Sequence, residues 1–157
     1  MLKQISLLIL CAVAIVLFAT PVHACTSAVV SGKVTLDGRP LLWKNRDTDF
    51  MRNHVDYVKG ERYDFIAVVN SANAYLKEAW MGTNSAGFAL MNTQSYNLVD
   101  VKGDEERGAA NGRVIYRALE VCATVEDFCH FLDTISKPSD IEANFGVIDA
   151  QGGAAMF

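Results

Sequence analysis

The hydrophobic and polar positions follow a strand-like pattern in the first half of the chain. Short apolar runs bounded by polar and turn-forming residues predict strands over residues 26–31, 40–45, 64–69, 74–81 and 87–92. The turn signal Asp37-Gly38-Arg39-Pro40 joins the first two strands into a hairpin. Residues 50–62 are mixed and polar, and they are expected to form a loop. Since no helix is predicted between these strands, they should pair antiparallel.

The period changes in the second half of the chain. Gly112 is expected to open a helix whose apolar side consists of Val114, Ile115, Ala118, Leu119 and Cys122. Thr124 with Asp127 three residues later forms a capping box that starts a second helix, and Lys137-Pro138 ends it. Residues 145–149 and 154–157 predict a further hairpin with its turn at residues 151–153. The pattern therefore predicts an α+β fold with antiparallel sheets.

Residues 1–24 have the pattern of a secretory signal peptide. Lys3 gives a positive start, residues 5–20 form an apolar run, and Val22-His23-Ala24 places a small residue before the cleavage point. The run of 16 residues is shorter than the about 20 that a membrane-spanning helix needs. We therefore expect cleavage between Ala24 and Cys25 and a secreted or periplasmic protein, with an uncleaved membrane anchor as the alternative.

Composition limits the classes of function. The 157 residues contain 14 Lys and Arg against 18 Asp and Glu, and the net charge of -4 argues against a nucleic-acid partner. Only 20% of the residues are charged and 51% are hydrophobic, which excludes a long disordered acidic region. The length suits one domain, residues 25–157, after the signal peptide.

Cleavage before Cys25 would place a thiol and a free α-amine on one residue. An α-amine has an ordinary pKa of about 7.7–8.0, so near neutral pH it can accept the proton of the thiol. Cys25 can thus be both nucleophile and general base. Two alternatives use the same residue: a disulfide, or lipidation at the cell envelope, which would block both groups and make the membrane a partner. His23 fits a lipidation signal poorly.

The other cysteines of the domain are Cys122 and Cys129. On one straight helix their Cα atoms would lie about 10 Å apart, too far for a disulfide. They are expected to face the core together as small apolar residues. A metal role for Cys129-His130 has little support, because adjacent residues alone make no ligand set.

Three segments of the domain carry a recognisable pattern. They are Cys25-Thr26-Ser27 after the signal peptide, Lys44-Asn45-Arg46-Asp47 at the end of the second strand, and Gly87-Phe88-Ala89-Leu90-Met91-Asn92. The combination resembles the N-terminal-nucleophile hydrolases of the choloylglycine hydrolase, acid ceramidase and penicillin acyltransferase type. The resemblance implies an αββα sandwich with antiparallel sheets. Members of this group are much longer, so residues 25–157 are expected to be an N-terminal portion of such a domain.

The resemblance also implies roles for particular residues. Cys25 would be the nucleophile, Asp47 would hold its α-amine, and the Asn92 amide would help to form the oxyanion hole. The family arginine position holds Lys44, while Arg46 directly precedes Asp47, so the cationic role stays open between the two. Purely structural alternatives also stay open: Asp47 as a turn or capping residue, Asn92 as a strand-end residue and Arg46 as a solvated or salt-bridged arginine. Trp43, Trp80 and Tyr96 are expected to pack rather than to form a substrate platform.

The resulting hypothesis is an exported cysteine hydrolase that cleaves a linear amide C–N bond through an acyl-enzyme on Cys25. A small-molecule amide is the implied substrate, and neither a metal nor an organic cofactor is implied. The alternative is a secreted or lipid-anchored protein without catalytic activity. The sequence leaves the acyl and amine specificity, the choice between hydrolysis and acyl transfer, and the oligomeric state open.

Overall fold

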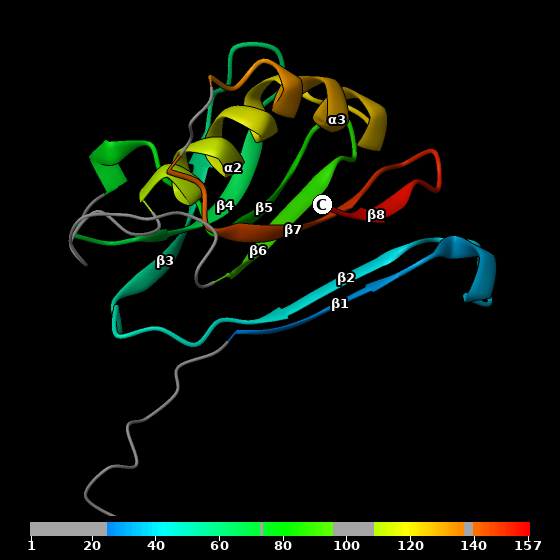
Figure 1. Cartoon of the computed structure of the whole chain (residues 1–157), viewed down its shortest axis with the longest axis horizontal. Helices are drawn as coiled ribbons and strands as arrows, with labels where there is room; N and C mark the ends of the chain where they lie inside the picture. The colour runs from blue at the N-terminus through cyan, green and yellow to red at the C-terminus, as the bar shows by residue number, and fades with distance from the viewer. Residues whose placement is uncertain (1–24, 73, 96–108, 137–139) are drawn as a thin grey trace, which may run out of the picture.

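The computed structural model describes residues 25–72, 74–95, 109–136 and 140–157 (Figure 1). The predicted signal peptide, Tyr96 and the predicted helix end at Lys137-Pro138 lie outside these residues. Two helices cover one face of a six-stranded sheet, and a two-stranded hairpin lies on the other face. This arrangement confirms the predicted α+β class with antiparallel sheets. Within the described residues, no helix is both long enough and apolar enough to cross a membrane.

All strand pairs are antiparallel, and the large sheet follows the order of the chain. The hairpin consists of β1 (Thr26–Val30) and β2 (Leu41–Asn45), which are joined through the short 3-10 helix η1 (Gly32–Val34). The sheet consists of β3 (Asn53–Val58), β4 (Phe65–Asn70), β5 (Met81–Asn84), β6 (Ala89–Gln94), β7 (Ala143–Ile148) and β8 (Ala154–Met156). The helices are α2 (Ala109–Val121) and α3 (Val125–Asp133), and a second 3-10 helix, η2, spans Ala74–Leu76.

Several local predictions are wrong. Residues 50–62 are not a loop, because β3 forms there as an edge strand whose largely exposed faces tolerate polar residues. Residues 74–81 are not a strand: η2 occupies the start, and Lys77 adopts a left-handed φ of 55° that an extended strand cannot contain. The first helix begins at Ala109 instead of Gly112.

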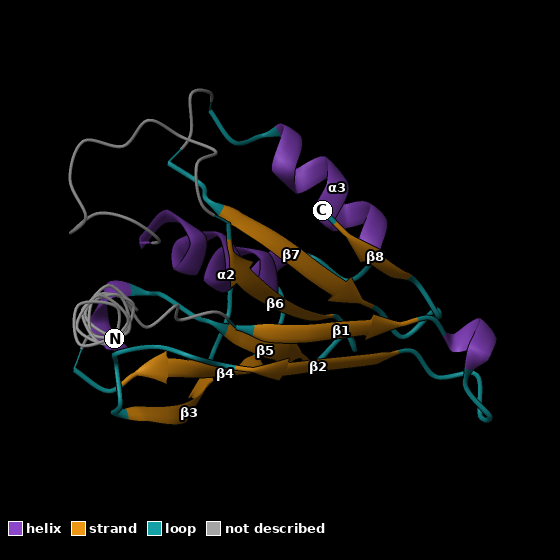
Figure 2. Ribbon diagram, turned by 60° about the horizontal axis from the view of Figure 1, so that its bottom comes forward, coloured by secondary structure: helices purple, strands orange, loops and turns teal. Residues whose placement is uncertain are grey.

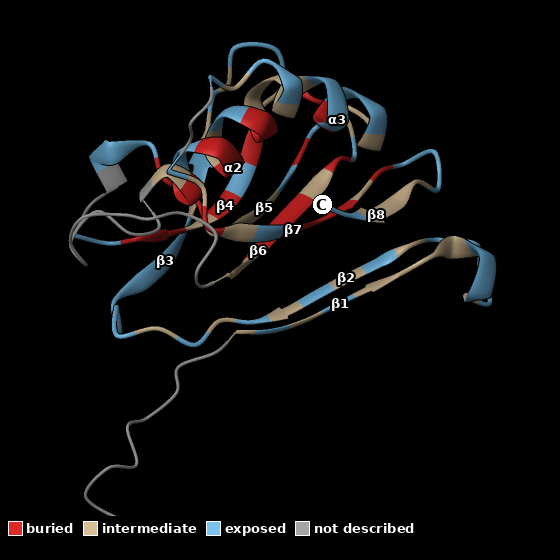
Figure 3. Cartoon of the chain, viewed as in Figure 1, coloured by how far each residue is buried: buried red, intermediate tan, exposed pale blue. Residues whose placement is uncertain are grey.

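The core lies between the helices and the sheet (Figure 3). Along β4 the side chains of Phe65, Ala67 and Val69 are buried toward the helices, while Ile66 between them is 47% exposed. Their partners include Ile115, Leu119 and Phe128 from the helices, together with Leu90 and Val147 from the sheet. The single apolar side of the helices therefore determines which face of the sheet becomes the core.

The cysteine prediction is half correct. Cys122 is buried, and burial raises the pKa of its thiol to about 12. Cys129 is exposed, because α2 ends at Val121 and a separate helix, α3, turns Phe128 into the core in its place. Thr124 and Asp127 form the predicted capping box of α3, with each side chain bonded to the backbone of the other residue.

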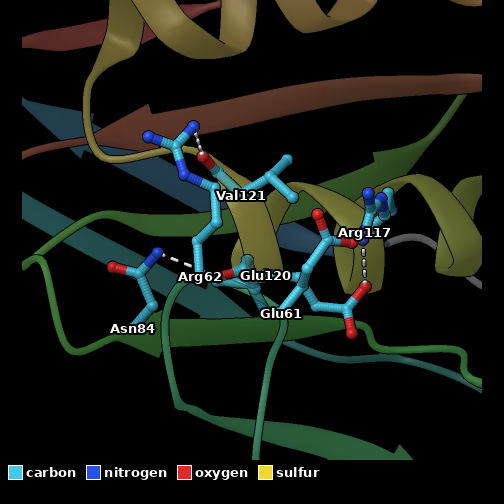
Figure 4. Close-up of polar contacts among 7 residues, drawn as sticks. Glu61, Arg62, Asn84, Arg117, Glu120 and Val121 are labelled. Atoms are coloured by element: carbon cyan, nitrogen blue, oxygen red, sulfur yellow. Dashed lines mark hydrogen bonds and ion pairs between the residues drawn. The ribbon is translucent and has the colours of Figure 1, made fainter.

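Asn84 fastens the C-terminal end of α2 to the sheet. Its side-chain NH2 group donates to the carbonyls of Leu119 and Cys122, at 2.9 and 2.7 Å. Nearby, Arg117 pairs with Glu61 at 2.6 Å, and the carbonyl of Glu120 accepts two backbone N–H groups from the loop before β4 (Figure 4). The bonds from Asn84 and from the loop N–H groups satisfy carbonyls that a helix end would otherwise leave unpaired.

The hairpin crosses the helix-free face of the sheet over β6, β7 and β8 (Figure 2). Gly146 on β7 permits this close approach. A Cβ atom there would lie 2.9 Å from Val29 Cγ2 of the hairpin and 2.3 Å from Met91 Cε of β6. Neither strand of the hairpin contains a fully buried residue.

Candidate active site

Cys25 directly precedes β1, and the hairpin brings the end of β2 back beside it. In the antiparallel register Thr26 pairs with Asn45, which places Cys25 next to Arg46 and Asp47. The Cys25 thiol donates to the backbone carbonyl of Asp47 at an Sγ–O distance of 3.6 Å. The hairpin turn thus joins two of the three sequence segments that carry the resemblance.

A cavity of about 170 Å³ opens beside the Cys25 thiol. It is lined by all five candidate residues, Cys25, Lys44, Arg46, Asp47 and Asn92, together with Thr48, Phe50, Trp80 and Gln94. A second, mainly apolar cavity of about 290 Å³ lies between β2 and the sheet and shares only Lys44 with the first. The structure therefore brings all the predicted site residues together around one space.

Lys44 links β2 to β6 through its ammonium group. Nζ donates to the Asn92 carboxamide oxygen and to the backbone carbonyl of Trp80, both at 3.0 Å. Burial lowers the pKa of Lys44 to about 8, and the neighbouring Cys25 opposes this shift while Arg46 adds to it. A partly desolvated cation with a pKa near neutrality thus lies beside the candidate nucleophile.

Arg46 points to a different set of partners. Its guanidinium donates to the side-chain oxygens of Asn53 and Asn70, at 2.9 Å for Asn70, and lies 4.9 Å from the centre of the Trp80 ring. Burial lowers the pKa of Arg46, and the electrostatic interaction with Cys25 only partly opposes this shift. Arg46 is therefore held by Asn53 at the start of β3, by Asn70 at the end of β4 and by the face of the Trp80 ring.

Asn92 presents an amide donor that the described protein leaves unused. The residue is 3% exposed on β6, where its backbone pairs with Phe145 of β7. A lysine ammonium can only donate, so the Asn92 atom bonded to Lys44 is the carbonyl oxygen and the other is the NH2 group. Among the described residues, that NH2 group has no hydrogen-bond partner. It is available to a negatively charged oxygen in the cavity.

Asp47 contributes its backbone to the contact with Cys25. Asp47 is exposed and lines the same cavity. The Asp47 carboxylate therefore belongs to the same residue whose backbone carbonyl contacts Cys25. Its role in holding the α-amine remains a prediction.

Four lining residues were not among the candidates. Gln94 lies two positions after Asn92 on the same strand, so the strand period alone could have indicated that it shares the face. Thr48 and Phe50 follow Asp47 in a segment whose local pattern carries no signal. Trp80 lines the cavity and carries a buried ring N–H that has no partner among the described residues. Trp43, expected to pack, is 55% exposed.

The described residues offer no metal site. No group of three or more His, Cys, Asp or Glu side chains in the described ranges is arranged to hold an ion. Cys25, Cys122 and Cys129 are all free thiols, so the disulfide alternative for Cys25 is absent from this part of the chain. The chemistry that the described site can offer is a thiol, two cations and an unused amide donor.

Comparison with known proteins identifies one family. The family model described as acyl-coenzyme A:6-aminopenicillanic acid acyl-transferase matches residues 35–157, which is most of the chain. The matched range contains every candidate residue except Cys25, which precedes it. A search of curated proteins finds no match.

Proposed function

The chain belongs to the acyl-coenzyme A:6-aminopenicillanic acid acyl-transferase family, a family of the N-terminal-nucleophile type, and on this basis we propose that it forms an acyl-enzyme on Cys25. The proposed substrate is a linear amide. The observation that carries the proposal is that the Cys25 thiol and the Asn92 residue with its unused amide donor line the same cavity. This combination provides both parts that acyl transfer needs, a nucleophile and a donor for the oxyanion.

The first step is attack by the thiolate on the amide carbonyl. The Cys25 Sγ–C bond forms, the carbonyl π electrons move onto oxygen, and the α-amine of Cys25 takes the thiol proton. The Asn92 NH2 group donates to the resulting oxyanion. Donors of this kind contribute about 10²–10³ in rate at other enzymes, where they act in a site prepared before the reaction.

The second step breaks the C–N bond. The oxyanion electrons re-form the carbonyl, and the leaving nitrogen takes the proton from the Cys25 α-ammonium group. Water or an acceptor amine then attacks the thioester, which returns the electron pair and a proton to Cys25. The choice between these acceptors decides whether the net reaction is hydrolysis or acyl transfer.

The cations and Asp47 act on the charges that appear during these steps. Lys44 and Arg46 stabilise negative charge on Sγ, because both groups interact electrostatically with Cys25. In the proposal, the Asp47 carboxylate orients the α-ammonium group of Cys25 once the signal peptide has been removed. Export followed by cleavage between Ala24 and Cys25 is therefore part of the mechanism, since only cleavage creates the amine.

The experiment follows the acyl-enzyme directly. The exported protein is purified, its N-terminal residue and intact mass are measured, and it is mixed with a panel of acyl p-nitroanilides. We expect a Cys25 N-terminus, a burst of p-nitroaniline and an acyl adduct on the peptide that begins with Cys25. Cys25→Ala should lose both signals, whereas Cys129→Ala, which removes an exposed thiol outside the cavity, should keep them.

Two results would overturn the proposal. One is an adduct or burst that persists in Cys25→Ala. The other is a Cys25 that carries a diacylglyceryl group in the purified protein, because lipidation blocks both the thiol and the amine.

A further inference from the structure

We propose that Lys44 is a positioning residue that fixes the Asn92 carboxamide so that its oxygen is engaged and its NH2 group is left for the substrate. The inference rests on the proposed function only in assigning the oxyanion to Asn92. The juxtaposition of the Lys44 ammonium and the Asn92 oxygen, at 3.0 Å across two sheets, carries it.

The amide of an asparagine has two orientations of similar shape. They differ by a half-turn about the last side-chain bond, which exchanges oxygen and NH2. In the observed orientation the ammonium faces an acceptor. In the reversed orientation, the Asn92 NH2 group would face the Lys44 ammonium at the same 3.0 Å, so that two donors would meet. The carbonyl oxygen, and no longer the NH2 group, would then be left unpaired. Lys44 therefore selects one of two states of Asn92.

Both ends of this contact are held firmly. The backbone of Asn92 is paired with Phe145 in the sheet, and its side chain is almost fully buried. The Lys44 ammonium is anchored a second time by the carbonyl of Trp80 at 3.0 Å. Since the anchor on Trp80 belongs to the backbone, a rotation of the tryptophan side chain does not release it.

Arg46 cannot replace Lys44 in this position. Its guanidinium is shared between Asn53, Asn70 and the Trp80 ring, and it makes no hydrogen bond to Asn92. Lys44 of β2 and Arg46, which follows the end of β2, thus have separate partners. Only Lys44 acts on the amide that would meet the oxyanion.

The strength of the contact should depend on protonation. The pKa of Lys44 is lowered to about 8 by burial, with Cys25 and Arg46 as the charged or titratable groups that influence it and Asp47 on the same cavity. Below this pH the ammonium makes a charge-assisted hydrogen bond, and above it the neutral amine makes a weaker one. The orientation of Asn92 should therefore be least well fixed in alkaline solution.

The test reads the amide itself and needs no substrate. The side-chain NH2 signals of Asn92 are followed by ¹H–¹⁵N NMR in the whole protein and in Lys44→Met, Lys44→Arg and Lys59→Met. We expect Lys44→Met to shift and broaden the Asn92 pair, Lys44→Arg to restore part of the native signal, and the exposed Lys59→Met control to leave it unchanged. In the unsubstituted protein the same signals should titrate with a midpoint of about 8.

Activity provides the second readout. If the proposed function holds, Lys44→Met should lower kcat by about 10- to 100-fold with a small change in KM, as expected for a misplaced oxyanion donor. Unchanged Asn92 signals in Lys44→Met, or Asn92 signals that stay constant while the Lys44 side chain itself is seen to titrate in the native protein, would refute the positioning role. Since the titration uses the native chain, it decides the question even where Lys44→Met fails to fold. Absence of an acyl adduct on Cys25 would instead refute the proposed function and leave the NMR result intact.

Discussion

The most informative test of the fold is the replacement Asn84→Ala. Asn84 is 6% exposed and joins three parts of the molecule. Its NH2 group donates to the carbonyls of Leu119 and Cys122 at the end of α2. Its side-chain oxygen accepts the backbone N–H groups of Ala86 and Phe88, both at 3.1 Å, in the turn between β5 and β6. One side chain therefore closes a helix end and a hairpin at once.

The expected cost follows from these four contacts. The bond from the Ala86 N–H is partly buried, so this N–H can be solvated by water when the side chain is removed. The other three bonds are buried. Each buried group left without a partner costs about 1–3 kcal/mol. With partial relaxation around the smaller side chain, we expect Asn84→Ala to lower the free energy of unfolding by about 3–5 kcal/mol.

A second substitution separates hydrogen bonding from volume. Asn84→Asp keeps the acceptor for Ala86 and Phe88 but faces the carbonyls of Leu119 and Cys122 with another acceptor. A negative charge at the C-terminal end of a helix is also unfavourable. We expect Asn84→Asp to be destabilised at neutral pH as strongly as the alanine variant. It should recover part of the loss in acid, where the carboxyl group is protonated and can donate.

The assay is urea unfolding followed by circular dichroism, with the midpoint and the slope fitted separately. Asn144→Ala is the matched control, because Asn144 is exposed and makes one long contact of 3.4 Å to Thr93. The control should change stability by less than about 0.5 kcal/mol. A loss below about 1 kcal/mol in Asn84→Ala, or equal losses in Asn84→Ala and the control, would refute the account of Asn84 as a shared anchor.

Two further substitutions test the hairpin contact and the helix cap. Gly146→Ala would place a Cβ 2.9 Å from Val29 Cγ2 and 2.3 Å from Met91 Cε, so we expect a loss of about 1–3 kcal/mol in urea unfolding, and an unchanged midpoint would contradict the close approach. The pKa of the Asp127 carboxyl is lowered, first by the backbone N–H of Ala123, so its charge stabilises the fold above the ordinary aspartate value of 3.8 and this contribution is lost as the pH falls through the folded pKa. Asp127→Asn should therefore cost about 0.3–1 kcal/mol at neutral pH and nothing in strong acid, and a deficit that stays constant with pH would count against the charge as its cause.

Local signals predicted the parts of the fold that depend on neighbours in the sequence. Thr124 and Asp127 bond to each other's backbone within one helical turn, so the capping box could be identified without tertiary information. The hairpin of β1 and β2 was likewise predicted from its turn residues and from the alternation of apolar and polar positions. The strand predicted over residues 74–81 failed for the opposite reason. That segment docks on α2, with the N–H of Ala79 bonded to the carbonyl of Gly112, and this partner is distant in the sequence.

Edge position explains the strand that the pattern missed. β3 pairs only with β4 in the described sheet, and most of its residues are exposed on both faces. His54 and Asp56 are therefore acceptable in it, and they alternate with Val55 and Tyr57, so a short strand period was present although the mixed composition of residues 50–62 favoured a loop. The same absence of a covering layer leaves Val55 and Tyr57 exposed.

The sequence could not show which partners Lys44 and Arg46 each contact, because those partners belong to other segments of the chain. Alternation predicts that Lys44 and Arg46 share a face if the strand continues past Asn45, and their order in the sequence does not say which one meets Asn92. The answer lies in the acceptors supplied by other strands. Two asparagine oxygens at the ends of β3 and β4 are separated so that a planar, forked guanidinium can bond to both. At position 44, two acceptors lie at 3.0 Å from one nitrogen atom, which suits a compact ammonium with several donors on a single centre. Lys44, at a position where the family resemblance implies an arginine, is therefore matched by its own acceptors, and its effect on the site is best understood through the amide that it contacts.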